Sequence, residues 1–124
     1  MGRYYHGDIE GKFWFAIQSS DDADYFGVEG VSNYLGYYFD KEDDYQNVLK
    51  GLERCVKHLG KNQFEKIDKA FSKGGSLYEG YNDKSLAEEG INEHQLEWYA
   101  RWLLGNQIKE CLDEQGYCSF EAEL

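Results

Sequence analysis

Polar and apolar positions alternate in four short stretches of the chain, at residues 5–9, 13–17, 34–39 and 117–124. Because successive side chains of a strand point to opposite faces, this period predicts four strands that each carry one apolar face. A three-residue loop at residues 10–12 keeps the apolar rows of the first two strands together, and it pairs Ile9 with Phe13 and Tyr5 with Ile17. The last strand is expected to pair with the N-terminal ones.

Between the strands, apolar residues recur at steps of three and four, which is the period of a helix packed on one side. The clearest stripe runs from Tyr45 to Leu59. Gly105 lies inside the last predicted helix and costs about 1 kcal/mol relative to alanine, so we expect it to mark a close crossing or a bend. The helices are expected from an N-cap at Asp40 to Gly60, over residues 64–71, from Asn82 or Asp83 to Glu89, and from an N-cap at Asn92 to about Gln115.

This order of elements predicts an α+β fold in a single domain over residues 1–124. The sheet is expected to be antiparallel or mixed and four-stranded, with three N-terminal strands plus a C-terminal strand, and with about four helices packed on one face. A chain of 124 residues has the usual length of one domain, and no apolar run approaches the roughly 20 residues of a membrane span.

The three cysteines, Cys55, Cys111 and Cys118, show no metal-ligand spacing. Two of them fall on predicted apolar faces, so we expect them to be small buried hydrophobic residues. The N-terminal residues lack the apolar core of a secretory signal, which favours a reducing cytoplasm. No cofactor is expected, because the chain contains no phosphate-binding or catalytic motif.

The charge balance is the most informative feature of the composition. The chain has 24 acidic residues and 13 lysines and arginines, which gives a net charge of −11. Such a surface repels nucleic acid and anionic membranes, which both bind to clustered positive charge. The expected partner is therefore a basic protein surface, with no direct nucleic acid and no membrane. The alternative is that the charge serves solubility alone.

The polar face of the predicted sheet is rich in tyrosine, and acidic residues gather in the loop and helix start beside it. Aromatic rings and carboxylates suit the binding of cationic side chains, whereas the alternative is that the rings are cross-strand pairs that stabilise an exposed sheet. The residues expected on the polar face are Tyr4, His6, Asp8, Lys12, Trp14, Tyr34, Tyr38, Tyr117, Glu121 and Glu123. The residues expected to bind the partner are Asp21, Asp22, Asp24, Tyr34, Tyr38, Asp40, Glu42, Asp43 and Asp44.

Two functional hypotheses follow. The leading one is a non-enzymatic acidic binding protein, in its most specific form an inhibitor whose carboxylates imitate a nucleic-acid backbone. The alternative is a small metal-dependent hydrolase that uses His6 and Asp8. His6, Asp8 and Glu10 alternate along one predicted strand, but such a spacing of roughly 6–7 Å is wide for a metal site.

Overall fold

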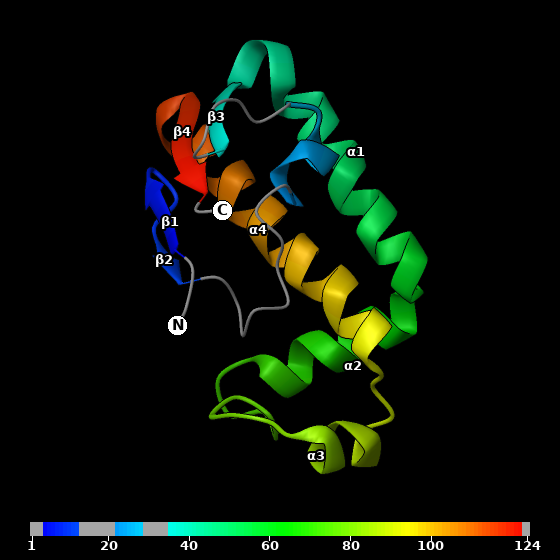
Figure 1. Ribbon diagram of the computed structural model, residues 1–124. Helices are drawn as coiled ribbons and strands as arrows, with labels where there is room; N and C mark the ends of the chain where they lie inside the picture. Colours follow the sequence, from blue (N-terminus) through cyan, green and yellow to red (C-terminus); the bar gives the residue numbers. More distant parts are fainter. Residues whose placement is uncertain (1–3, 13–21, 29–34, 123–124) are drawn as a thin grey trace.

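The computed structural model describes residues 4–12, 22–28 and 35–122 of the chain. It shows a small sheet beside a layer of helices (Figure 1). In chain order the elements are β1 (Tyr4–Gly7), β2 (Gly11–Lys12), the 3₁₀ helix η2 (Asp22–Phe26), β3 (Leu35–Asp40), α1 (Lys41–Leu59), α2 (Lys61–Phe71), α3 (Asp83–Glu88), α4 (Glu93–Gln115) and β4 (Tyr117–Ala122).

The sheet has the order β2-β1-β4-β3, and all its neighbouring strands are antiparallel. Strand β4 therefore lies between β1 and β3, as the predicted pairing of the last strand with the N-terminal ones requires. Its side chains alternate between exposed and buried along its whole length. One face of the sheet is apolar and buried, and its buried residues are Tyr5, Tyr37, Phe39, Cys118, Phe120 and Ala122.

The α+β class is confirmed, but the predicted four-stranded sheet is wrong. Three antiparallel strands, β1, β3 and β4, form the sheet of the described residues, and β2 adds only a two-residue pairing at its edge. The strand expected at residues 13–17 lies outside the described residues.

The predicted hairpin register is also wrong, because Tyr5 pairs with Gly11 and not with Ile17. The chain leaves β1 at Gly7, whose φ of +117° suits glycine. Asp8 then keeps a hydrogen bond to β4, and Ile9 turns into the core with 4% of its surface exposed. The turn therefore lies at residues 8–10, earlier in the chain than the face pattern of the strands suggested, and Ile9 is buried within it.

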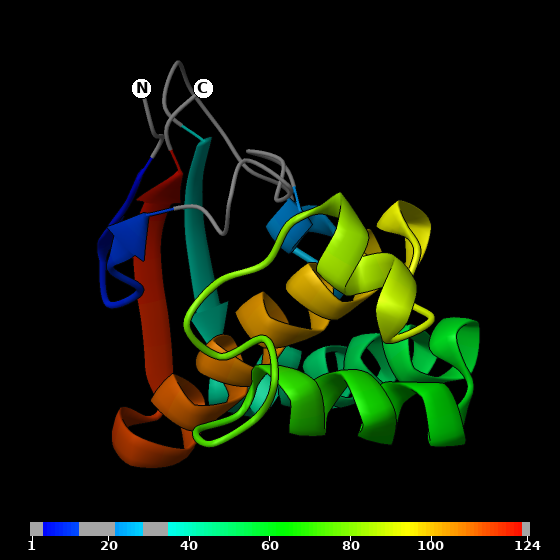
Figure 2. The same cartoon turned by 90° about the horizontal axis from the view of Figure 1, so that it is seen from below.

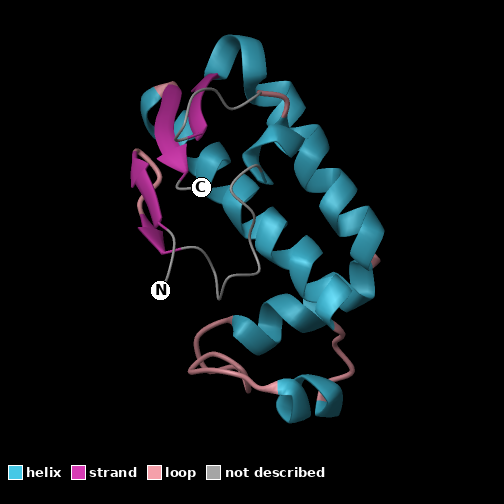
Figure 3. Cartoon of the chain, viewed as in Figure 1, coloured by secondary structure: helices cyan, strands magenta, loops and turns pink. Residues whose placement is uncertain are grey.

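The expectation that about four helices cover one face of the sheet is also wrong. Only α1 and α4 make extensive contacts with both the sheet and each other. Helices α2 and α3 lie at the end of the molecule away from the strands (Figures 2 and 3). They pack on the first half of α4 around a second core cluster, formed by Leu59, Ile67, Ala70, Leu77, Leu86, Ile91, Leu96 and Tyr99.

Local signals set the boundaries of α1 and α4 as predicted, whereas α2 begins at Lys61, three residues before the predicted start. The Asp40 carboxylate accepts a hydrogen bond from the Asp43 N–H at 3.2 Å and caps α1. Asn92 and Gln95 form a reciprocal capping box at the start of α4. Gly116, with a φ of +84°, ends α4 in the left-handed conformation and turns the chain into β4.

Candidate partner-binding surface

The outer face of the sheet, opposite the buried apolar row, carries exposed tyrosine rings. Tyr38 of β3 is 57% exposed and Tyr117 of β4 is 44% exposed. Their rings are stacked, with centroids 6.4 Å apart and planes inclined by 11°. Tyr4 of β1 is also 44% exposed and lies 6.4 Å from the His6 ring. The structure therefore places the predicted Tyr38 in an open aromatic cluster.

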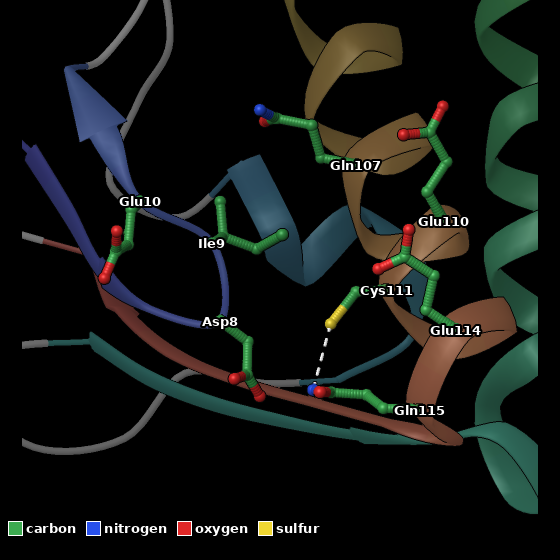
Figure 4. Close-up of a pocket in the computed structure, with 8 residues that line it drawn as sticks. All are labelled: Asp8, Ile9, Glu10, Gln107, Glu110, Cys111, Glu114 and Gln115. Carbon is green, nitrogen blue, oxygen red and sulfur yellow. Dashed lines mark hydrogen bonds between the residues drawn. The ribbon is translucent and has the colours of Figure 1, made fainter.

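A pocket of about 320 Å³ lies on the helix side of the sheet, between the turn that follows β1 and the last turns of α4 (Figure 4). Asp8 and Glu10 contribute carboxylates from the turn, and Glu110 and Glu114 contribute carboxylates from the helix. No lysine or arginine is among its described lining residues, which are completed by Ile9, Gln107, Cys111 and Gln115. The pocket therefore gathers negative charge from two segments about a hundred residues apart in sequence.

Hydrogen bonds join the pocket residues to the backbone of β4. The Asp8 carboxylate accepts from the Ser119 N–H at 2.8 Å, and the Asp8 N–H donates to the Ser119 carbonyl at 2.7 Å. Tyr38 pairs with Ser119 from the other side of β4. Gln115 of the pocket donates to the Tyr117 carbonyl at 3.0 Å. We refer to the pocket carboxylates and the exposed tyrosines together as the acidic–aromatic surface, whose two parts are connected through the backbone of β4; its residues are Asp8, Glu10, Tyr38, Glu110, Glu114 and Tyr117.

Two lysines close to the end of α4, Lys41 and Lys109, are paired with Asp113. Lys109 of α4 donates a hydrogen bond to Asp113 at 2.9 Å, and this bond lowers the pKa of the Asp113 carboxyl. The Lys41 ammonium lies 3.6 Å from the same carboxylate. Asp113 thus holds both neighbouring lysines, and the four pocket carboxylates have no lysine or arginine among their lining residues.

The acids expected at the start of α1 divide into two kinds. Asp40 caps the helix, and its own N–H donates to the Asp44 carboxylate at 2.8 Å. Glu42 and Asp43 have exposed side chains. Asp40 also pairs with Tyr117 across the sheet, so this helix start borders the acidic–aromatic surface.

The acids expected in the preceding loop have internal roles. Asp22 is only 5% exposed, and its carboxylate accepts from the Arg101 guanidinium at 3.3 Å. That guanidinium also lies 4.5 Å from the Trp98 ring centroid. Asp24 accepts a hydrogen bond from the Tyr37 hydroxyl. These two carboxylates fix η2 to the core, while the predicted Asp21 and Tyr34 lie outside the described residues.

Glu110 and Glu114 are the surface residues that sequence reasoning missed. They are one helical turn apart, and both are exposed on the polar side of α4. Their i, i+4 spacing was a usable signal for one acidic helix face. The sequence carried no signal that the turn holding Asp8 and Glu10 would face them, because that contact depends on the β1–β4 pairing.

The two residues of the hydrolase hypothesis, His6 and Asp8, lie on either side of the end of β1 at Gly7. Asp8 and Glu10 line the pocket, whereas His6 pairs with Glu121 on the outer sheet face. Within the described ranges, no three side chains of histidine, cysteine, aspartate or glutamate are placed to share a metal ion.

Two further findings bear on the wider setting of this surface. Within the part of the chain that the structure describes, no helix combines the length and apolar character needed to cross a membrane. Comparison with known family models, curated proteins and solved structures yields no match for this chain.

Proposed function

We propose that this chain is a non-enzymatic binding protein whose acidic–aromatic surface engages a basic segment of another protein. The observation that carries the proposal is the pocket lined by four carboxylates and no cation among the described residues. Carboxylates accept charge-assisted hydrogen bonds from arginine and lysine, and these bonds are stronger than those between neutral groups.

The stacked tyrosines support the same partner chemistry. Tyr38 and Tyr117 offer large, rigid contact area on the outer face of the sheet. Exposed aromatic faces also attract ammonium and guanidinium groups, with about 0.5–1 kcal/mol at exposed sites. A basic segment can therefore place one cationic side chain in the pocket and another over the rings.

A nucleic-acid-binding protein is the most specific form of this partner, because its binding groove already recognises spaced negative charge. In that form the acidic–aromatic surface takes the place of the phosphates. Nucleic acid then competes with this chain for the partner, so a duplex oligonucleotide is expected to displace it.

The test measures the affinity of a fluorescent arginine- and lysine-rich peptide by anisotropy. We expect the double variant Glu110→Gln/Glu114→Gln to weaken binding by about tenfold, since it removes two carboxylates that can form charge-assisted hydrogen bonds with the peptide. The matched control is Glu65→Gln/Glu79→Gln, which removes the same net charge from exposed positions outside the surface. It should change affinity by less than about twofold.

Equal losses in both double variants would show that only net charge matters, and would contradict this surface as the binding site. Binding that is unchanged by salt would remove the electrostatic basis of the proposal altogether.

A further inference from the structure

Two of the three cysteines lie at the junction of α4 and β4. Cys111 is in the second-last turn of α4, and it is half-buried in the wall of the acidic pocket (Figure 4). Cys118 is the second residue of β4 and is completely buried in the first core cluster, against which Cys111 packs. One thiol therefore faces the pocket, and the other lies behind it.

The backbone holds these two thiols close together. The Cys111 thiol donates to the Tyr117 carbonyl at 3.3 Å. That carbonyl belongs to the peptide group that leads into Cys118, so bond lengths place the Cys118 Cα within about 6 Å of the Cys111 sulfur. The Cys118 backbone is therefore a direct neighbour of the Cys111 sulfur, as an intramolecular disulfide between the two residues requires. Burial, and after it the neighbouring Cys111 thiol, raises the pKa of the Cys118 thiol above its ordinary value.

We propose that Cys111 and Cys118 form a site at which hydrogen peroxide reversibly oxidises the two thiols. Cys111 is the thiol that peroxide attacks, because it lines the pocket, and Cys118 is the resolving thiol. The product is an intramolecular disulfide that ties the end of α4 to the start of β4.

The reaction balances in two steps. The Cys111 sulfur attacks one peroxide oxygen, so that an S–O bond forms, the O–O bond breaks, and protonation of the departing oxygen releases water. The Cys118 sulfur then attacks the Cys111 sulfenic acid, the S–S bond forms, and the hydroxyl group leaves as a second water with the Cys118 proton. In total, two thiols lose two electrons and one peroxide is reduced to two waters.

The surroundings of Cys111 favour this oxidant over larger ones. Four carboxylates line the pocket and repel an anionic disulfide such as oxidised glutathione, whereas hydrogen peroxide is small and neutral. The Gln115 amide donates a hydrogen bond to the Cys111 sulfur at 3.3 Å. This donor stabilises negative charge on the sulfur during the attack.

Cys55 serves as the internal control. It is fully buried in α1, and burial raises the pKa of its thiol to about 12. Burial raises the pKa of the Cys118 thiol as well, so what separates these two cysteines is position, because Cys118 directly follows the carbonyl that binds the Cys111 thiol. We expect Cys55 to stay reduced while the other two cysteines react.

The experiment treats the folded protein with a small excess of hydrogen peroxide, alkylates the remaining thiols and maps tryptic peptides by mass. Because no lysine or arginine follows Lys109, residues 110–124 form one peptide that contains both cysteines. We expect this peptide to lose about 2 Da, to resist alkylation and to recover with dithiothreitol. Overoxidation of Cys111 without a link, or a link to Cys55 or between two chains, would overturn the proposal.

A denatured sample separates the effect of the fold from simple nearness in sequence. Folded protein is expected to form the link at least about tenfold faster than protein in concentrated urea, because the fold holds the thiols in position. Equal rates would contradict the proposal that the fold positions the two thiols for reaction. In Cys118→Ala, the sulfenic acid on Cys111 should persist and react with dimedone; in Cys111→Ser, Cys118 should stay reduced.

Discussion

Phe26 illustrates how one side chain of this protein depends on two glycines far from it in sequence. Its ring has no exposed surface and lies between α1 and α4. A Cβ atom at Gly51 would lie 2.5 Å from the ring, and one at Gly105 would lie 2.3 Å from it. The close approach expected at Gly105 is therefore a contact with the ring of η2, which any larger residue would push away.

We predict that Gly105→Ala destabilises the fold by about 1–3 kcal/mol, because overpacking outweighs the better helix propensity of alanine. Urea unfolding followed by circular dichroism measures the change. Gln107→Ala, an exposed substitution in the same helix, is the control and should stay within about 0.5 kcal/mol of the unsubstituted protein. Adding Phe26→Leu to Gly105→Ala should recover part of the loss, and additive losses would contradict the contact.

The exposed tyrosines of β3 and β4 have two possible roles: they can stabilise the sheet, or they can bind a partner. Tyr38 and Tyr117 are diagonal neighbours on the outer face, and their rings are stacked. A cross-strand pair of this kind contributes about 0.2–1 kcal/mol. Both roles are physically compatible, so stability and affinity have to be measured on the same variants.

We predict that a double-mutant cycle of Tyr38→Ser and Tyr117→Ser gives a stability coupling below about 1 kcal/mol. Each single variant should lower the affinity for the basic peptide by about threefold or more, because it removes an aromatic face from the binding surface. Tyr78→Ser, which removes a tyrosine 54% exposed in the loop after α2, is the matched control. If Tyr38→Ser and Tyr117→Ser bind the peptide as tightly as the control does, the two rings have a purely structural role.

At the scale of the whole molecule, the surface charge costs stability in the same place where it is proposed to bind. The chain carries a net charge of −11, and Glu110 and Glu114 repel each other at i, i+4 on α4 beside Asp8 and Glu10. Such a concentration of like charge is stabilised when salt screens it or when a cationic partner covers it.

We predict that Glu114→Gln raises the free energy of unfolding by about 0.5 kcal/mol at low ionic strength. The gain should vanish between about 10 mM and about 0.5 M sodium chloride, where the Debye length falls below the spacing of the carboxylates. Urea titrations of both proteins at the two salt concentrations measure this. Glu65→Gln is the control, and a gain of the same size there would mean that the repulsion is spread over the whole surface.

The local parts of this structure could be predicted because they depend on short stretches of sequence. The alternation in residues 117–122 gave the half-buried β4, and the cap residues Asp40 and Asn92 gave the starts of α1 and α4. Each of these signals is complete within a few neighbouring residues, because strand and helix periods and capping hydrogen bonds are local.

By itself, then, the sequence determined the element types, most helix boundaries, the buried row of the sheet and the excess of negative charge. The tertiary structure decided which carboxylates act inside the fold and which meet at the surface. Asp22 is paired by Arg101, and the pocket joins Asp8 to Glu114, although these partners are 79 residues and about a hundred residues apart. Such contacts follow from burial of Ile9 and Phe26 in one core, and the free energy of that packing is shared by residues that no local pattern connects.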